Sequence, residues 1–215
     1  MKMIDVHTLD AHIKDGMTIM VGGFLGAGTP EMLVDYIVEK GYKDLTLICN
    51  DTAFPDKGVG KLVVAKQIGK AIVSHIGTNP ETGRQMMAEE MEVELVPQGS
   101  LAEKVRCGGV GLGGILTPTG IGTEVEADKT VVEVNGEKFI LEQPLHADLA
   151  LIYASTADEK GNLVYEGSTK NFNPLMAMAA DTVIAEVGEV VPVGTLNPDS
   201  ILTPHILVDY MVKGA

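Results

Sequence analysis

A short apolar run followed by a helix-like segment occurs four times in the first half of the chain, and this repeat most constrains the fold. The predicted strands are residues 18–21, 45–49, 71–75 and 92–96, and the predicted helices are residues 30–40, 60–67, 79–90 and 100–107. Strands that alternate with helices across short connections favour a parallel sheet. We therefore predict an α/β fold with an open, largely parallel sheet that is covered by helices.

Four of the predicted helix ends, three starts and one stop, carry specific signals. Thr29 is the expected N-cap of the first helix, with Pro30 at the first helical position and Gly41 as the stop. Asn79-Pro80 is the expected start of the third helix. Residues 100–103 read Ser-Leu-Ala-Glu, which fits a capping box and predicts that the fourth helix begins there.

The second half of the chain differs in style. Residues 108–122 hold seven glycines, which predicts an ordered irregular loop. Asn135-Gly136 between residues 130–134 and 137–141 is a strong signal for a two-residue hairpin. Further strands are predicted at residues 149–153 and 182–187, and a helix at residues 174–180. Because no internal repeat or low-complexity segment is present, residues 1–215 are expected to form a single domain with a hairpin insertion.

The first predicted strand runs directly into a loop with four glycines in seven residues, Gly22 to Gly28. Glycine has no Cβ, so backbone N–H groups in such a loop can approach a ligand closely. The following helix would aim its positive end at the same place, which suits a phosphate or a developing oxyanion. The spacing is neither that of a P-loop nor that of the dinucleotide fingerprint. The segment is therefore predicted to be a binding loop of another kind.

Residues that follow the predicted strands are expected to share one site with this loop. Gly22, Asn50, Ile76-Gly77 and Gln98 each come just after a strand. Ligands on parallel sheets gather at the carboxyl ends of the strands, which lie along the same edge. His75, at the end of its strand, either lines the edge of this site or is a structural histidine.

Several motifs resemble those of one protein family over nearly the whole chain. Residues 15–30 run from Asp-Gly through apolar residues to Gly-Gly-Phe and then Gly-x-Pro. Further similar motifs are Asn50-Asp51-Thr52, Ile76-Gly77-Thr78-Asn79-Pro80, Val96-Pro97-Gln98-Gly99, Cys107-Gly108-Gly109, Thr117-Pro118-Thr119-Gly120 and Asn171-Phe172-Asn173-Pro174. Together they resemble the α (or A) subunit of the family I coenzyme A transferases, most closely the bacterial acetate/acetoacetate and butyrate–acetoacetate enzymes.

The resemblance implies a transfer of CoA between carboxylic acids in which a glutamate forms a thioester with CoA. In that family the glutamate lies in the β subunit, in a Ser-Glu-Asn-Gly context that this chain lacks. Residues 133–136 read Glu-Val-Asn-Gly, but the hairpin turn explains this sequence. No catalytic residue is therefore expected in this chain, which we expect to be inactive without a β partner, in an α2β2 assembly. No permanently bound cofactor or metal is expected, and CoA or acyl-CoA is the expected substrate.

The resemblance also implies which residues of this chain form the other wall of the site. The loop residues expected to bind CoA or the reacting oxygen are Gly22, Gly23, Phe24, Leu25, Gly26, Ala27 and Gly28. Asn50, Gln98 and Gly99 are expected to contact the acyl group or the oxyanion, although an Asx turn at Asn50 and loop bracing by Gln98 are alternatives. Asp51 stands where relatives often carry an amide, so we expect it to brace the loop.

Composition limits the partners. Lys plus Arg is 16 and Asp plus Glu is 30, which gives a net charge of −14. A chain this acidic is expected to repel nucleic acid and anionic membranes. The two cysteines, Cys49 and Cys107, form no CxxC motif, and no secretory start or long apolar segment is recognisable. We therefore expect a cytoplasmic protein.

Two other readings remain open from the residues. A sugar-phosphate isomerase or deaminase on a related scaffold would need an acid/base carboxylate beside the glycine loop, and Asp51 and Glu81 are the candidates. A binding or regulatory module that keeps the fold without catalysis is the other. Within the transferase reading, the choice among acetate, butyrate and acetoacetate stays open, because one methylene in a pocket is worth only about 1–3 kcal/mol.

Overall fold

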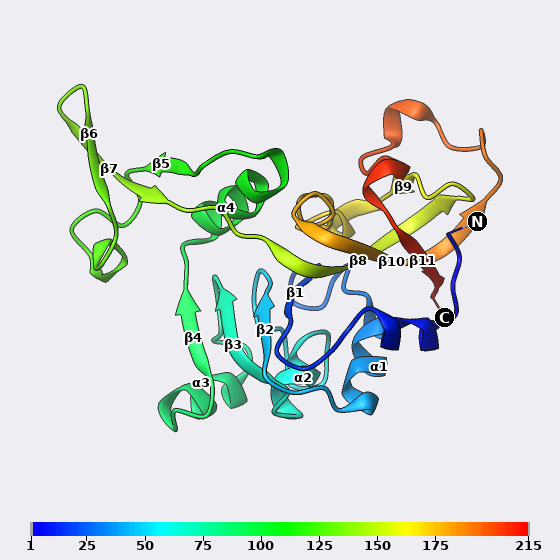
Figure 1. Cartoon of the computed structure of the whole chain (residues 1–215), viewed down its shortest axis with the longest axis horizontal. Helices are drawn as coiled ribbons and strands as arrows, with labels where there is room; N and C mark the ends of the chain where they lie inside the picture. The colour runs from blue at the N-terminus through cyan, green and yellow to red at the C-terminus, as the bar shows by residue number, and fades with distance from the viewer. Residues whose placement is uncertain (1, 215) are drawn as a thin grey trace.

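The computed structural model describes residues 2–214, and its main feature is a large, mostly parallel sheet (Figure 1). Its strands are β1 (Thr18–Val21), β2 (Leu45–Ile48), β3 (Ile68–Val73), β4 (Glu92–Leu95), β8 (Ala147–Asp158), β9 (Leu163–Val164), β10 (Ala180–Val191) and β11 (Tyr210–Lys213). The strand order is β11-β10-β8-β1-β2-β3-β4, all parallel, while β9 pairs antiparallel with β8. The predicted α/β fold with a largely parallel sheet is confirmed.

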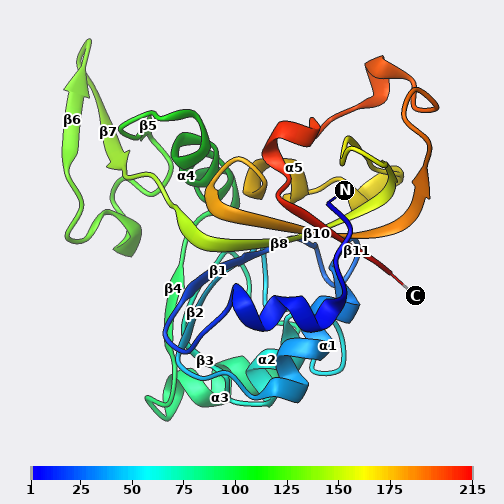
Figure 2. The same ribbon diagram turned by 45° about the vertical axis from the view of Figure 1, so that its right-hand side comes forward.

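Helices cover both faces of this sheet. The α-helices are α1 (Glu31–Lys40), α2 (Gly60–Val64), α3 (Pro80–Met87), α4 (Gln98–Val110) and α5 (Asn173–Met176). The 3-10 helices are η1 (Val6–Ala11), η2 (Glu124–Glu126), η3 (Gly167–Thr169), η4 (Pro198–Ser200) and η5 (His205–Leu207). Helices α1 to α3 lie on one side of the sheet and α4 and α5 on the other (Figure 2). Within residues 2–214, no helix is both long and apolar enough to cross a membrane.

The alternation of side chains along the strands divides the core into two layers. Ile19 and Val21 of β1 pack with residues of α1 and α2, whereas Met20 between them packs with residues of α4 and α5. All three side chains are fully buried. A strand with an apolar residue at every position is what a parallel sheet with helices on both faces requires. This double burial fixes where β1 ends and the glycine loop begins.

A second sheet projects from the body as an arm, formed by β5 (Ile115–Thr117), β6 (Val131–Val134) and β7 (Glu137–Glu142) (Figure 1). The predicted hairpin is confirmed, with Asn135 and Gly136 at φ values of 54° and 81° in the turn. The prediction of one irregular loop over residues 108–122 is wrong in part. Helix α4 extends to Val110, and β5 pairs with β7 inside the same segment.

Two predicted helix starts are also corrected. Helix α4 begins at Gln98, so Ser100 lies inside the helix and is not its N-cap, and the Ser100 hydroxyl is buried without a partner. The N-cap position of α1 is Pro30 and not Thr29, and it has no side-chain cap. The predicted stop at Gly41 and the Asn79 cap of α3 are confirmed: Gly41 is left-handed at φ 73°, and the Asn79 side chain accepts from the Glu81 N–H.

Candidate active site

The residues that follow β1 to β4 line one cavity at the carboxyl edge of the sheet. Its volume is about 360 Å³. The lining residues are Phe24, Leu25, Asn50, Asp51, Ser74, His75 and Gln98. Four of the ten sequence-predicted site residues thus meet here, from the glycine loop, the end of β2 and the start of α4. Parallel neighbours in the order β1-β2-β3-β4 bring these strand ends together.

Asn50 is the centre of a hydrogen-bond network at the floor of this cavity. Its side-chain oxygen accepts a bond of 2.7 Å from Gln98 Nε2, and its amide nitrogen donates to Asp51 at 2.6 Å. The Ser74 hydroxyl donates to the Asn50 backbone oxygen at 2.7 Å. Asn50 is almost fully buried, whereas Gln98 is exposed. Asn50 therefore positions Gln98, and one Nε2 hydrogen of Gln98 is left to face the cavity.

Asp51 braces the glycine loop, as the sequence led us to expect. Its carboxylate accepts the Leu25 N–H at 3.0 Å and the Ala53 N–H at 2.8 Å, besides the bond from Asn50. The group is 4 % exposed, so these three donors replace the water that an ionised carboxylate needs. Two of the donors are backbone N–H groups and the third is the amide of the neighbouring Asn50, so the role of the Asp51 carboxylate is to brace the loop.

Two asparagines hold the loop from the opposite side. Asn171 accepts the Gly23 N–H at 3.1 Å and donates to the Ala27 oxygen at 2.9 Å. Asn173 donates to the Gly28 oxygen at 2.9 Å. Sequence reasoning noted their motif, Asn171-Phe172-Asn173-Pro174, as part of the family likeness but assigned it no role. The motif was visible in the sequence, but its contact with the glycine loop was not, because the two segments are about 145 residues apart.

The glycines of the loop are required by this packing. A Cβ on Gly22 would lie 1.7 Å from Asn173 Oδ1, and one on Gly23 would lie 2.1 Å from Thr29 Oγ1. A Cβ on Gly28 would lie 2.5 Å from the Thr169 oxygen. The glycines thus allow close approach of the protein's own side chains and backbone.

Most backbone N–H groups of the loop already have acceptors within the chain. Gly22 donates to the Leu151 oxygen at 2.9 Å, and Phe24 and Ala27 exchange bonds of 3.0 and 2.9 Å across a tight turn. Gly23 and Leu25 donate to Asn171 and Asp51, as described above. Among the hydrogen bonds of residues 2–214, none satisfies the amides of Gly26 or Gly28. Two amides of the loop thus have no acceptor among the described residues, fewer than its glycine content suggested, and neither Gly26 nor Gly28 lines the 360 Å³ cavity.

The N-terminal N–H groups of α1 bind a carboxylate of the same chain. Glu186 of β10 accepts the Met32 N–H at 2.9 Å and the Leu33 N–H at 3.1 Å through one carboxylate oxygen. Burial raises the pKa of Glu186 to about 6, although these two amides oppose the shift. The expectation that this helix end faces the ligand is wrong, because a buried carboxylate of the same chain caps it.

Gly99 and His75 lie at two different cavities. Gly99 lies apart from the cavity described above and lines a separate one of about 400 Å³ between α4 and β5. His75 lines the main cavity, which is one of the two alternatives that the sequence left open for it. Ser74 beside it lines the cavity too, although sequence reasoning did not name it as a site residue. The signal was their position at the end of β3, the same signal that selected Asn50.

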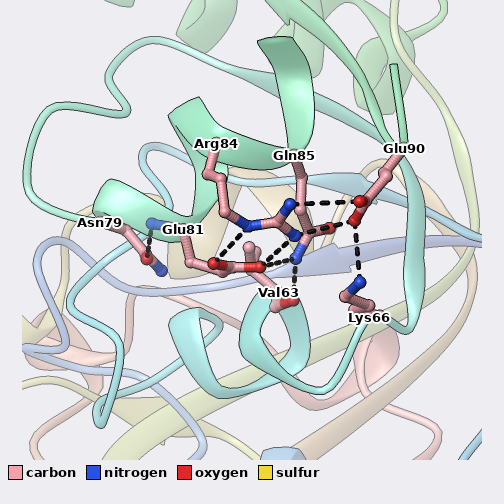
Figure 3. Close-up of polar contacts among 7 residues, drawn as sticks. All are labelled: Val63, Lys66, Asn79, Glu81, Arg84, Gln85 and Glu90. Carbon is pink, nitrogen blue, oxygen red and sulfur yellow. Dashed lines mark hydrogen bonds and ion pairs between the residues drawn. The ribbon is translucent and has the colours of Figure 1, made fainter. Parts of the chain in front are cut away.

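Neither carboxylate required by the isomerase reading is free to act. Asp51 is committed to the loop. Glu81 lies on α3, where Arg84 binds it at 2.7 Å and also binds Glu90 at 2.8 Å (Figure 3). The ion pair with Arg84 lowers the pKa of Glu81 to about 2, which is unsuited to proton transfer near neutral pH. The geometry therefore gives no support to that alternative. In the described residues no group of three or more histidine, cysteine or acidic side chains could hold a metal ion.

Comparison with known proteins gives the family. Residues 4–214 match the model of the coenzyme A transferase family. The chain belongs to the coenzyme A transferase family. It is 54% identical to the acetate CoA-transferase subunit alpha of Escherichia coli over 98% of this chain and 96% of that protein. It is 51% identical to the acetoacetyl-CoA:acetate/butyrate CoA transferase alpha subunit of Clostridium acetobutylicum, over 99% and 97%. The chain is thus a CoA-transferase polypeptide of the kind named alpha subunit in these relatives.

Solved structures of this family share the fold at low sequence identity. An acyl-CoA transferase from Escherichia coli O157:H7, in a thioester complex with CoA, has a TM-score of 0.89 at 22% identity. The match covers 99% of the coenzyme A transferase chain described here and 47% of that longer chain. Glutaconate coenzyme A-transferase from Acidaminococcus fermentans has a TM-score of 0.86 at 19% identity and covers 100% and 76%.

Proposed function

We propose that this chain is the α subunit of an enzyme that exchanges CoA between short-chain carboxylic acids, and that it works with a separate β chain. The names of the two relatives quoted above, for acetate and for acetoacetyl-CoA with acetate or butyrate, support this substrate class. The observation that carries the proposal is the cavity at the carboxyl edge. It presents the remaining Nε2 hydrogen of Gln98 to a small acyl group, and its one carboxylate, Asp51, is committed to the loop.

In the proposed reaction, a glutamate carboxylate of the β chain attacks the acyl-CoA carbonyl, and the carbon–sulfur bond breaks. The products of this step are an acyl–glutamyl anhydride and CoA thiolate. The thiolate attacks the glutamyl carbonyl, which releases the first acid as a carboxylate and leaves a glutamyl–CoA thioester. A second carboxylate runs both steps in reverse. CoA is then a substrate, and the thioester energy is kept without a permanent cofactor.

This chain's own residues supply binding and electrostatic stabilisation in that scheme. Gly26 and Gly28 donate their free N–H groups to CoA or to an oxyanion, and Gln98 donates its remaining Nε2 hydrogen to the acyl oxygen. Phe24 and Leu25 contact the acyl chain. Each donor aimed at a developing oxyanion contributes about 3–4 kcal/mol of transition-state stabilisation. Asn50 acts through Gln98 as a positioning residue.

The test is to express the chain with and without its β partner and measure acyl exchange between acetyl-CoA and butyrate. We expect exchange by the pair and none by either chain alone, with borohydride trapping the thioester on a glutamate of the β chain. Gln98→Ala should lower kcat/KM by about 100-fold in the pair. Gln143→Ala, an exposed glutamine on the link after the arm, is the matched control and should leave it unchanged.

A trapped adduct on any glutamate of this chain would overturn the assignment of roles. So would full exchange by this chain alone. An α2β2 stoichiometry, which we also propose, is checked by the mass of the co-purified assembly in solution.

A further inference from the structure

A lysine side chain lies across the tip of the glycine loop. A Cβ on Gly26 would be 3.3 Å from Lys57 Cδ, 3.5 Å from its Cβ and 3.7 Å from its Cγ. The aliphatic stem of Lys57 therefore covers the face of Gly26 where other residues carry a side chain. The Lys57 N–H donates to the Phe54 oxygen at 3.1 Å, so a tight turn fixes the root of this side chain.

The Lys57 ammonium group has no carboxylate partner. Over residues 2–214, no aspartate or glutamate oxygen lies within 4.0 Å of its Nζ. This differs from its neighbour Lys61, which pairs with Glu31 and Asp35 between α2 and α1. Among the residues described, Lys57 is thus an exposed lysine without an ion pair beside Gly26, whose amide is free. Two carboxylates near them, Asp51 and Glu31, are held by the N–H groups of Leu25 and Gly58.

A second exposed lysine stands on the other flank of the loop. Lys170 lies between Thr169, whose oxygen faces Gly28, and Asn171, which bonds Gly23 and Ala27. No ion pair of Lys170 occurs in the described part of the chain either. Two exposed lysines without ion pairs in residues 2–214, Lys57 and Lys170, thus lie in segments that contact the loop and are far apart in sequence.

We propose that Lys57, together with the free amides of Gly26 and Gly28, binds a phosphate group of the CoA substrate, and that Lys170 adds positive charge to this subsite. The inference rests on the proposed function. Backbone N–H groups in a turn form a concavity suited to an anion, and lysine binds phosphate as a point charge. The subsite resolves a problem that the composition raises, since a polyanion such as CoA must approach a strongly acidic chain.

The test uses the two-chain enzyme, and it exploits ping-pong kinetics. Lys57→Gln should lower kcat/KM for acetyl-CoA about tenfold, because one charged contact to phosphate is lost. The kcat/KM for butyrate, the accepting acid, should stay within about twofold of the unsubstituted enzyme. That half-reaction starts from the CoA thioester of the enzyme, in which the phosphate contact is already made. The acid itself carries no phosphate.

Three acyl donors, acetyl-CoA, acetyl-pantetheine and acetyl-dephospho-CoA, identify which phosphate Lys57 binds. Acetyl-pantetheine, which lacks the nucleotide, should show the same kcat/KM with the unsubstituted enzyme and with Lys57→Gln. Acetyl-dephospho-CoA lacks the 3′-phosphate but keeps the diphosphate. Loss of the effect with this donor would assign the 3′-phosphate, and persistence would assign the diphosphate.

Lys43→Gln is the matched control, because Lys43 is exposed, makes no ion pair in residues 2–214 and precedes β2 at the opposite edge of the sheet. It removes the same charge and should change no kinetic constant. An equal loss with all three donors, or no loss with acetyl-CoA, would overturn the role of Lys57 while exchange by the unsubstituted enzyme upholds the proposed function. Absence of exchange by the unsubstituted pair overturns both.

Discussion

Replacement of Gly22 by alanine tests whether the glycine loop is held by the protein's own side chains. Gly22 does not have a positive φ, so alanine is compatible with its backbone. The space is the obstacle, because the new Cβ would lie 1.7 Å from Asn173 Oδ1 and 2.6 Å from its Cγ. Asn173 must therefore leave its position.

The magnitude follows from what Asn173 would lose. Its side chain accepts the Tyr153 N–H at 3.0 Å and donates to the Gly28 and Thr169 oxygens at 2.9 and 2.8 Å. Each bond contributes about 1 kcal/mol net, and overpacking adds about 1–3 kcal/mol. We expect Gly22→Ala to lower the free energy of unfolding by about 4–6 kcal/mol, which lowers Tm by about 8–24 °C for a domain of this size.

Thermal and urea unfolding of the co-expressed complex and of the isolated chain are the assays. Gly83→Ala on α3 is the matched control, because nothing lies within 4 Å of its Cβ position. It should raise stability by about 0.5–1 kcal/mol. In an Asn173→Ala background, Gly22→Ala should cost less than about 1 kcal/mol, since the clashing group is gone. Equal stability of Gly22→Ala and the unsubstituted chain, or additive effects in the double variant, would refute the packing argument.

Three further predictions concern buried charges and thiols. Burial raises the pKa of Glu186 from 4.5 to about 6. Its contribution to stability is therefore full below pH 4.5 and falls by about 2 kcal/mol in total as pH rises through 6, and unfolding of Glu186→Gln measured from below pH 4.5 to above pH 6 should lack this loss. Burial would raise the pKa of Glu142, but the ion pairs with Lys129 and Lys104 lower it, so the stability from this cluster is present above pH 4.5 and lost in acid. Glu142→Ala should lower the free energy of unfolding of the arm by about 3–5 kcal/mol, and we expect faster amide exchange in residues 115–142 but not in α1. Burial raises the pKa of Cys49 well above 9.0, so this thiol should not react with a thiol reagent until the chain unfolds. Rapid labelling of Cys49 in the native chain would contradict this.

The loop around Gly22 to Gly28 is held in place by three side chains of the same chain. Asp51 accepts the Leu25 N–H, Asn171 accepts the Gly23 N–H, and Asn173 donates to the Gly28 oxygen. In the proposed reaction, donors held in this way would stabilise charge without reorganisation. The loop is therefore a rigid element, and its glycines serve internal packing first.

The sequence by itself was sufficient for the parallel sheet, for the ends of β1, β2 and β4 to within one residue, and for the hairpin at Asn135-Gly136. These features depend on local periodicity and turn chemistry, which neighbouring residues specify. The grouping of Asn50, Gln98 and Leu25 also followed, because parallel strands end at a common edge. The end of β3 was predicted at residue 75 and lies at Val73, so Ser74 and His75, and not Ile76-Gly77, line the cavity.

Only the tertiary structure decided what each of those groups is bonded to. Glu186 caps α1 from a strand more than 150 residues away, and Asn173 occupies the space that Gly22 leaves open. The sequence pointed instead to Thr29 and to Ser100 as helix caps, because a capping signal is read from nearby residues alone. Hydrogen bonds between distant segments depend on how the two layers of helices pack against the sheet, and no short-range pattern encodes that packing.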